Sequence, residues 1–205
     1  MEELSNPTVE WAEARDPGAA LLVLLHGWGE SEGDMLERSR LLPSRFSYAS
    51  VGAPYSRGRH RDWFAAGRSF ESTRLWFEEW LDRVALERRV LLIGFSAGAA
   101  FGGGAVLMNP ARYLGMAMLC GTLPFDAAVP TPPGRLLGSE VFLAHRLDDT
   151  MIPRTLLERT WAYLTAESGA RCRAERYEGD HGVSTEMLSG LSAWLDEIIP
   201  ESGRP

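Results

Sequence analysis

The sequence VLLIGFSAGAA, residues 90–100, decides how this chain folds. Its first four residues are apolar and predict a buried strand, and the segment GFSAG that follows has the pattern G-x-S-x-G. This pattern encodes a sharp turn from a strand into a helix, with the hydroxyl of Ser96 exposed at its tip. We expect a strained backbone at Ser96, and side chains at Gly94 and Gly98 would collide across the turn. The positive end of the helix would face Ser96, where negative charge develops when a serine attacks a carbonyl.

The G-x-S-x-G pattern alone also fits a glycine-rich turn with a chance serine. The apolar strand before it and the small residues after it favour the strand-to-helix elbow. The uncharged run of residues 90–108 passes the length of about 18 residues that a membrane span needs. Its glycines and the turn itself favour a strand, a turn and a helix instead.

The chain has 205 residues, enough for one well-buried domain, and we expect a single domain over residues 1–205. Its net charge of -7 argues against a nucleic-acid-binding protein and against adhesion to anionic membranes. The two cysteines, Cys120 and Cys172, have no metal-site spacing, and the acidic N-terminal segment lacks the layout of a signal peptide. These features predict a reduced, cytoplasmic protein without stable membrane insertion.

Predicted strands and helices alternate along the chain. Apolar or alternating segments predict strands at residues 8–14, 19–25, 46–51, 90–93, 113–119, 140–144 and 171–177. Besides the helix after Ser96, helical patterns cover residues 32–42, 69–87, 153–168 and 184–199. Residues 55–67, rich in glycine and arginine, are predicted as an irregular loop. This order predicts an α/β fold, a mostly parallel sheet with helices on both faces and a site outside the carboxyl ends of its strands.

A serine hydroxyl is a weak nucleophile near neutral pH, so it needs a base, and the base needs an orienting acid. Of the four histidines, His26 and His145 follow predicted strands and His60 lies among arginines. His181 follows the last strand, between glycines that leave its loop free to swing. The chain order serine, acid, histidine favours His181 as the base, and a solvated loop histidine is the alternative.

The acid should lie between Ser96 and His181, after a strand. Asp148 and Asp149 both meet this condition. Either one could instead cap the helix predicted to begin near Pro153. Spacing alone does not separate these roles.

Two backbone N–H groups are needed to hold the negative oxygen that forms during attack on a carbonyl. The residue after the nucleophile, Ala97, is expected to supply one. The segment His26-Gly27-Trp28-Gly29 follows the first core strand, and Trp28 is expected to supply the other through its N–H, not its ring. A glycine-rich tight turn is the alternative for this segment.

Together these motifs resemble the phospholipase/carboxylesterase family of α/β-hydrolases, which includes acyl-protein thioesterases and small bacterial carboxylesterases. The resemblance runs through almost the whole chain, in HGWGESEGDML from residue 26, GAP at 52–54, WF at 63–64, the elbow, CGTLP at 120–124, HRLDDTMIP at 145–153 and DH at 180–181. The register of HRLDDTMIP implies that Asp149 is the acid of the triad and Asp148 a neighbour.

The resemblance implies an α/β-hydrolase fold without a large cap domain and a serine hydrolase that needs no cofactor and no metal. The implied substrate is a small-molecule acyl ester, with short to medium chains suiting an open site, cleaved through an acyl-enzyme on Ser96. An acyl thioesterase or a lysophospholipase with the same triad is the alternative among enzymes. A binding protein that keeps the fold without turnover is the alternative from another class, and a homodimer is left open.

Two positions depart from the family's pattern. Arg146 in the acid segment and Asp180 before the histidine each replace a glycine. A side chain at either place is expected to narrow the mouth of the site or to add charge, without removing a catalytic group.

Apolar side chains near the strand ends are candidate walls of an acyl pocket, and ordinary core or lid packing is the alternative for each: Trp28, Trp63, Phe64 and Leu123. A basic run lies on a predicted rim loop, at Arg57, Arg59, His60 and Arg61. It either meets an anionic leaving group or is simply solvated, as most charge runs are.

Overall fold

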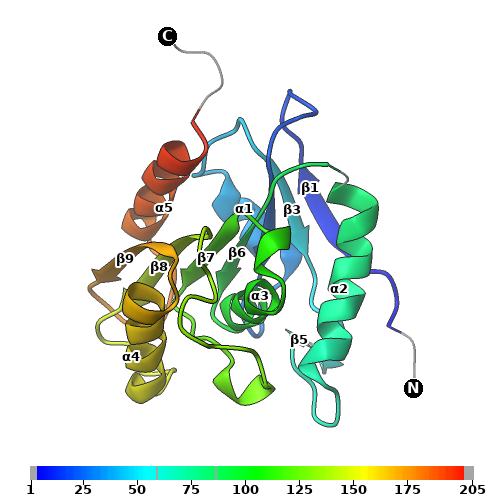
Figure 1. Cartoon of the computed structure of the whole chain (residues 1–205). Coiled ribbons are helices and arrows are strands. Elements are labelled where there is room, and N and C mark those ends of the chain that lie inside the picture. The colour runs from blue at the N-terminus through cyan, green and yellow to red at the C-terminus, as the bar shows by residue number, and fades with distance from the viewer. Residues whose placement is uncertain (1–3, 59, 86, 201–205) are drawn as a thin grey trace.

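In the part of the chain that the structure describes, seven strands form one sheet at the centre of the protein (Figure 1). The computed structural model describes residues 4–58, 60–85 and 87–200. The strands are β1 (Val9–Ala12), β2 (Leu21–Leu25), β3 (Ser47–Val51), β6 (Val90–Phe95), β7 (Gly115–Leu119), β8 (Glu140–Arg146) and β9 (Arg171–Tyr177). They follow the order β1-β3-β2-β6-β7-β8-β9. All neighbours are parallel except β1, which runs antiparallel to β3 at one edge.

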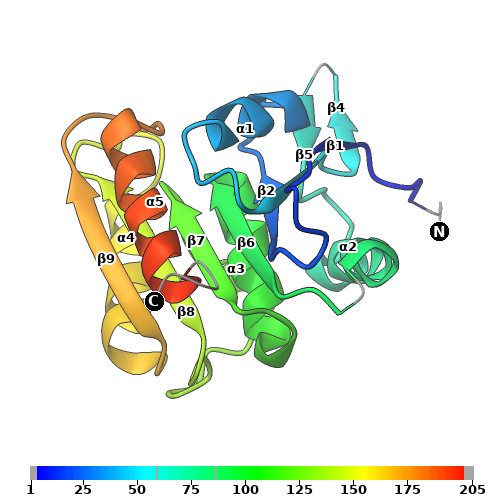
Figure 2. The same ribbon diagram turned by 90° about the horizontal axis from the view of Figure 1, so that it is seen from above.

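Helices cover both faces of this sheet (Figure 2). On one face lie α1 (Glu32–Ser39) and α5 (Thr185–Ile198), and on the other lie α2 (Phe70–Ala85), α3 (Ala97–Met108) and α4 (Arg154–Ala162). The prediction of a mostly parallel sheet with helices on both faces is confirmed. The described parts of the chain contain no large cap domain, and none of their helices has both the length and the apolar character needed to cross a bilayer.

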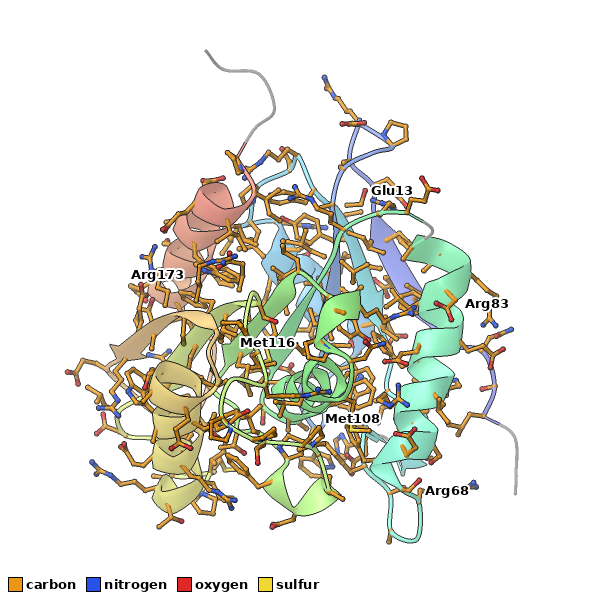
Figure 3. The ribbon with its side chains drawn as sticks, viewed as in Figure 1. Glu13, Arg68, Arg83, Met108, Met116 and Arg173 are labelled. Carbon is orange, nitrogen blue, oxygen red and sulfur yellow. The ribbon has the colours of Figure 1, made fainter. Side chains whose placement is uncertain are left out.

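The sheet is buried on both faces because successive side chains of a strand point to opposite sides. In β2 the first, third and fifth side chains pack with α2 and α3, whereas the second and fourth pack with α1 and α5. None of the five is more than 1% exposed, which explains why this strand is apolar throughout. In Figure 3, Met116 of β7 lies in the interior of the fold, whereas Arg83 and Arg173 lie at its periphery.

Residues 55–67, predicted as an irregular loop, contain a small hairpin. Its strands β4 (Tyr55–Arg57) and β5 (His60–Asp62) pair antiparallel, with Arg57 opposite His60. Gly58 has a φ of +65°, a conformation that glycine adopts without strain and that tight hairpin turns use. The prediction is wrong because a glycine between two short segments can make a hairpin turn as readily as it interrupts a strand.

The helix predicted over residues 153–168 is divided into α4 and a π-helical turn, η3 (Tyr163–Glu167). In this region the hydroxyls of Thr165 and Ser168 donate to the carbonyls four residues earlier. Such back-bonding competes with the regular helical ladder. Gly169, with a φ of +77°, ends the helical segment where the sequence predicted its end.

Candidate active site

The carboxyl ends of the parallel strands bring distant segments together at one edge of the sheet. His26 follows β2 and Ser96 follows β6. We call residues 147–153, after β8, the acid loop, and residues 178–184, after β9, the histidine loop. Because β6 lies between β2 and β7, Ser96 stands near the middle of this edge, between the loop after β2 and the two loops after β8 and β9.

Ser96 occupies the turn between β6 and α3. Its φ of 51° and ψ of -115° lie outside the regions that non-glycine residues usually adopt, a strain of about 1–3 kcal/mol. The Ser96 N–H donates to the Leu119 carbonyl at 2.9 Å, and the Ala100 N–H donates to the Ser96 carbonyl at 3.1 Å. The first-turn N–H groups of α3 have no carbonyl partner within the helix, so its positive end begins at Ser96. The strained serine expected from the sequence is present.

Close backbone contacts explain both glycines of the elbow. A Cβ atom at Gly94 would lie 2.5 Å from the backbone N and Cα of Ala99, on the helix side of the turn. A Cβ atom at Gly98 would lie 2.1 Å from the carbonyl oxygen of Leu25, at the end of β2. The predicted collision across the turn is therefore confirmed for Gly94, whereas a side chain at Gly98 would collide with the neighbouring strand β2.

Replacing Gly98 by alanine is expected to lower the free energy of unfolding by about 3 kcal/mol or more, because strand or helix backbone must move. Denaturant unfolding followed by circular dichroism measures this change. Gly33→Ala in α1 is the matched control, since its methyl group meets only side-chain atoms, none nearer than 3.4 Å. It should change stability by about 1 kcal/mol at most. Equal stability of Gly98→Ala and the wild type would contradict this packing of the elbow.

Ser96, His181 and Asp149 form a continuous hydrogen-bonded line. His181 Nε2 lies 3.0 Å from Ser96 Oγ, and His181 Nδ1 lies 2.8 Å from Asp149 Oδ2. An ionised carboxylate can only accept, so Nδ1 carries the proton of the neutral imidazole and Nε2 accepts from the serine hydroxyl. The imidazole also packs against the ring of Phe95, with centroids 5.2 Å apart. This geometry would suit a nucleophile, a base and an orienting acid.

The Asp149 carboxylate is fixed by backbone donors. Its side chain is 0% exposed, and its Oδ1 accepts the N–H groups of Met151 at 2.9 Å and Ile152 at 3.0 Å. These two bonds leave Oδ2 aimed at His181. The alternative role as a helix cap is not seen, since the N-cap of α4 is Pro153 and no side chain caps this helix.

Asp148, the other candidate acid, is exposed and makes different contacts. Its Oδ2 accepts the Gly179 N–H at 3.3 Å, and its own N–H donates to the Gly179 carbonyl at 3.2 Å. Asp148 therefore joins the acid loop to the histidine loop. Of the two carboxylates, it is Asp149 that contacts the imidazole of His181.

The loop after β2 gives the peptide between Gly27 and Trp28 a fixed orientation. The Gly27 carbonyl lies 2.8 Å from His26 Nδ1 and accepts the Glu30 N–H at 3.2 Å. His26 Nε2 accepts the Ala53 N–H at 3.0 Å, which puts the ring proton on Nδ1. Burial lowers the pKa of His26, so this fully buried imidazole is neutral. In a planar trans peptide the N–H opposes the C=O, so the Trp28 N–H points away from these partners.

Two further titratable side chains near the site, His145 and Cys120, are buried, and burial favours the neutral form of each. His145 is 3% exposed, its Nε2 lies 3.0 Å from the Gly121 carbonyl, and burial lowers its pKa. Burial raises the pKa of Cys120 to about 11, and the neutral thiol donates to the Gly182 carbonyl at 3.3 Å. Both side chains therefore support the loops around the site. The described ranges contain no group of three or more His, Cys, Asp or Glu side chains that could hold a metal ion.

The candidate pocket walls divide into core and surface. Trp63 is 1% exposed and stacks on Phe101 with centroids 4.6 Å apart, and Leu123 is 2% exposed. Both side chains therefore belong to the core, which was the alternative to contact with a substrate. Phe64 is half-buried, and Trp28 is 54% exposed. Phe64 and Trp28 thus stay candidates for contact with a substrate.

The basic run on the hairpin is only partly described. Arg61 donates from Nη1 to the Ala53 carbonyl at 3.0 Å, which holds the hairpin to the segment after β3. His60 packs against the ring of Trp28 with centroids 5.1 Å apart. Arg59 and the side chain of Arg57 lie outside the described residues. The described members of this run therefore support the hairpin and the loop after β2.

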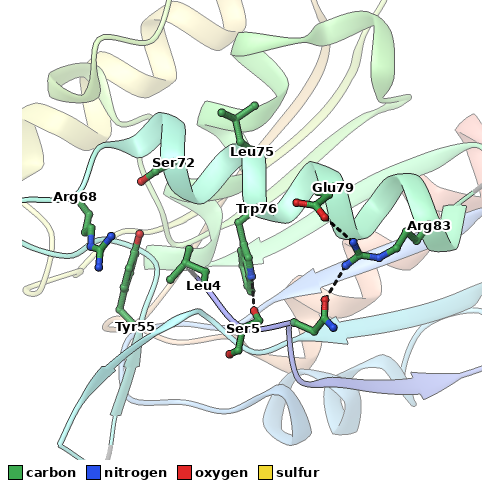
Figure 4. A pocket seen from close by; sticks show the side chains of 10 residues that line it. Leu4, Ser5, Tyr55, Arg68, Ser72, Leu75, Trp76, Glu79 and Arg83 are labelled. Carbon is green, nitrogen blue, oxygen red and sulfur yellow. Dashed lines mark hydrogen bonds and ion pairs between the residues drawn. The ribbon is translucent and has the colours of Figure 1, made fainter. Parts of the chain in front are cut away.

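A cavity of about 740 Å³ lies between the N-terminal segment and α2 (Figure 4). On its walls, Trp76 donates from Nε1 to the Ser5 carbonyl, and Arg83 bonds to Glu79 and Asn6. Ser96, His181 and Asp149 are not among the residues that line it. A smaller cavity of about 330 Å³ adjoins the acid loop and is lined in part by Asp149.

The side chains at the two departures from the family's pattern make contacts that hold the histidine loop in place. Arg146 donates to the carbonyls of Glu178 and Gly182, and Asp180 accepts from the Thr150 N–H. Their polar atoms are thus engaged between the loops. The expectation that they would narrow the mouth of the site missed this role.

Residues 66–199 match the family model described as Phospholipase/Carboxylesterase, well over half of the chain. The chain belongs to the phospholipase/carboxylesterase family. The matched range includes the elbow, the acid loop and the histidine loop, so Ser96, Asp149 and His181 all lie within it. The family suggested by the sequence motifs is thereby confirmed.

The chain is also similar to known carboxylesterases and to an acyl-protein thioesterase. Carboxylesterase SOBER1 of Arabidopsis thaliana is 29% identical over 117 residues, and the match spans 55% of this chain but only 50% of that relative. The solved Bacillus cereus carboxylesterase has a TM-score of 0.81 at 19% identity, over 94% of this chain and 95% of that one. Zea mays acyl-protein thioesterase 2 has a TM-score of 0.76 at 18% identity, over 93% and 98%. These structural likenesses confirm the α/β-hydrolase fold.

Proposed function

We propose that this protein is a serine hydrolase that cleaves carboxylic acyl esters, a carboxylesterase, through an acyl-enzyme intermediate. The main support for this proposal is the hydrogen-bonded line from Ser96 Oγ through His181 to the buried carboxylate of Asp149. Membership of the phospholipase/carboxylesterase family supports the same chemistry.

In the proposed reaction, His181 takes the proton of the Ser96 hydroxyl as its oxygen attacks the acyl carbonyl carbon. Asp149 orients the imidazole and stabilises the imidazolium that forms. The N–H groups of Trp28 and Ala97 hold the oxyanion. His181 then gives its proton to the alcohol oxygen as the carbon–oxygen bond breaks, and the alcohol leaves. His181 then takes a proton from a water molecule whose oxygen attacks the acyl carbon, and it returns this proton to Ser96 Oγ as the bond from the acyl carbon to Ser96 Oγ breaks and the acid leaves. Protein groups alone carry these steps.

The positions of Trp28 and Ala97 suit the proposed oxyanion site. Ala97 is the first residue of α3, so its N–H has no carbonyl partner in the helix. The Gly27 carbonyl is engaged on the other side of its peptide, which leaves the Trp28 N–H free to face a substrate. Loss of one such donor typically lowers kcat by about 100- to 1,000-fold, so each of these backbone groups would contribute strongly to the proposed rate.

We propose short to medium acyl chains as the preferred substrates. Among the described residues, the hairpin of β4 and β5 and the short turn Phe125–Ala127 follow the carboxyl ends of strands, but no domain large enough to enclose a long chain does. The exposed ring of Trp28 and the half-buried ring of Phe64 are the proposed apolar contacts for the acyl group.

A comparison of substrates on the purified protein tests this proposal. Nitrophenyl esters from acetate to palmitate, acyl thioesters and a lysophospholipid should be compared by kcat/KM. We expect saturable hydrolysis that is fastest for acetate to octanoate esters. Higher kcat/KM for the thioester or the lysophospholipid would assign the protein to that activity instead. No turnover and no covalent labelling by a fluorophosphonate would favour a binding protein that keeps the fold.

A further inference from the structure

The histidine loop depends on polar contacts for its position. It joins the edge strand β9 to α5, contains Gly179 with a φ of +101°, and none of its residues is buried. Val183 is the one apolar side chain of this loop, and it is only partly buried against the core under α5. A loop with so little burial opens easily unless other bonds hold it. The placement of His181 therefore depends on the groups that bind this loop on either side.

Asp180 joins the histidine loop to the acid loop directly beside the line of Ser96, His181 and Asp149. Its Oδ1 accepts the Thr150 N–H at 2.9 Å and the His181 N–H at 2.7 Å. The Thr150 hydroxyl lies 3.0 and 3.1 Å from the two oxygens of the same carboxylate. Since Thr150 follows Asp149 and Asp180 precedes His181, these bonds link the neighbours of the acid and the base.

The Asp180 carboxylate is ionised at neutral pH. Its hydrogen bond from the Thr150 N–H, followed by that from the His181 N–H, holds its pKa below the ordinary value. All of its lone pairs are then available as acceptors for the two loops.

Arg146 binds the same loop from the end of β8. Its Nε donates to the Gly182 carbonyl at 2.9 Å, and its Nη1 donates to the Glu178 carbonyl. The backbone of Arg146 is paired with Tyr177 of β9, so the guanidinium extends from a rigid part of the sheet. Because a guanidinium presents its donors in a fixed fork, this one side chain sets the separation of two carbonyls that bracket His181.

We propose that Asp180 and Arg146 are positioning residues that clamp the histidine loop and keep the imidazole of His181 within reach of Ser96 and Asp149. This inference rests on the proposed hydrolase function. Neither side chain touches the reacting atoms, since Arg146 acts through two carbonyls of the loop and Asp180 acts through the His181 N–H and Thr150. A displacement of about 1 Å at a catalytic group can cost about 100-fold in rate. Loss of the clamp therefore lowers turnover and leaves substrate affinity nearly unchanged.

Asp180→Ala tests the first half of the clamp. We expect kcat for nitrophenyl butyrate and the rate of phosphonylation by a fluorophosphonate to fall by about 10- to 100-fold, with KM changed by about threefold at most. Asp180→Asn should recover most of both rates, because its Oδ1 still accepts the two N–H groups and its Nδ2 can donate to the Thr150 hydroxyl. Glu178→Ala is the matched control, since it removes the same charge from the same loop and its carboxylate has no partner among the described residues.

Arg146→Ala tests the second half and should lower the same two rates. Arg146→Lys should recover only part of the loss, because an ammonium group cannot hold two carbonyls at a fixed separation. Arg171→Ala is the control at the other end of the paired strands β8 and β9, where it removes an ion pair with Glu140. It should leave both rates near those of the wild type.

The outcomes separate this inference from the proposed function. A wild-type protein that neither hydrolyses esters nor reacts with the fluorophosphonate contradicts the hydrolase itself. An active wild type with Asp180→Ala and Arg146→Ala equally fast contradicts only the clamp. The clamp is also contradicted if the loss of rate accompanies a fall in Tm and Asp180→Asn does not recover the rate. A general structural role of these residues would produce that result.

Discussion

Replacing Ser96 by alanine is expected to lower kcat/KM for nitrophenyl butyrate by about 10⁴-fold or more and to abolish labelling by a fluorophosphonate. The change removes the only protein atom that bonds to the acyl carbon in the proposed mechanism, and the remaining groups cannot replace it. Mass spectrometry of the intact protein after incubation with the reagent measures the labelling, and a continuous colorimetric assay measures the turnover.

The Ser96→Ala protein should keep its fold. Its backbone φ of 51° strains alanine about as much as serine, since both carry a Cβ atom. Circular dichroism and Tm close to those of the wild type would show that the loss of activity is chemical. Full labelling of Ser96→Ala would place the nucleophile at another residue and contradict the proposed mechanism.

Replacing Asp149 by asparagine is expected to lower kcat by about 10⁴-fold with little loss of stability. The N–H groups of Met151 and Ile152 would hold the amide oxygen where Oδ1 now lies. The amide NH₂ group would then face His181 Nδ1, where a donor already points. The imidazole must change tautomer to accept from the amide, and its Nε2 then carries a proton and cannot take one from Ser96. Steady-state kinetics measure the change.

Asp148→Asn is the matched control, with the same substitution one residue away. Asp148 accepts from the Gly179 N–H, and an asparagine oxygen can accept the same bond. We expect kcat to change by about threefold at most. A greater loss in Asp148→Asn than in Asp149→Asn would mean that the acid of the proposed triad has been assigned to the wrong residue.

The elbow was predictable because its signals are local. An apolar run, two glycines and a serine within residues 90–98 fix a strand, a strained turn and the start of a helix, and the structure has all three. The alternation of predicted strands and helices was enough to predict the layers of the fold and the edge of the sheet where the candidate site lies. The family's motifs added Asp149 over Asp148, a choice that spacing alone had left open.

The contacts between loops were not predictable from the sequence. Asp180 and Arg146 were identified as unusual, but the partners that Asp180 has in the acid loop and Arg146 in the histidine loop lie 30 or more residues away in the sequence and come near through the pairing of β8 with β9. Trp63 was a candidate for a pocket wall because an aromatic near a strand end fits a site and a core equally well. Its stacking on Phe101, in a distant helix, is what makes it part of the core.

A crystal structure of the protein after reaction with a fluorophosphonate would show the proposed nucleophile and oxyanion site together. We predict phosphorus bonded to Ser96 Oγ, with the phosphoryl oxygen within hydrogen-bond distance of the N–H groups of both Trp28 and Ala97. His181 should remain on Asp149 in the adduct. Phosphorus on another residue, or a phosphoryl oxygen that turns away from both N–H groups, would contradict the proposed mechanism.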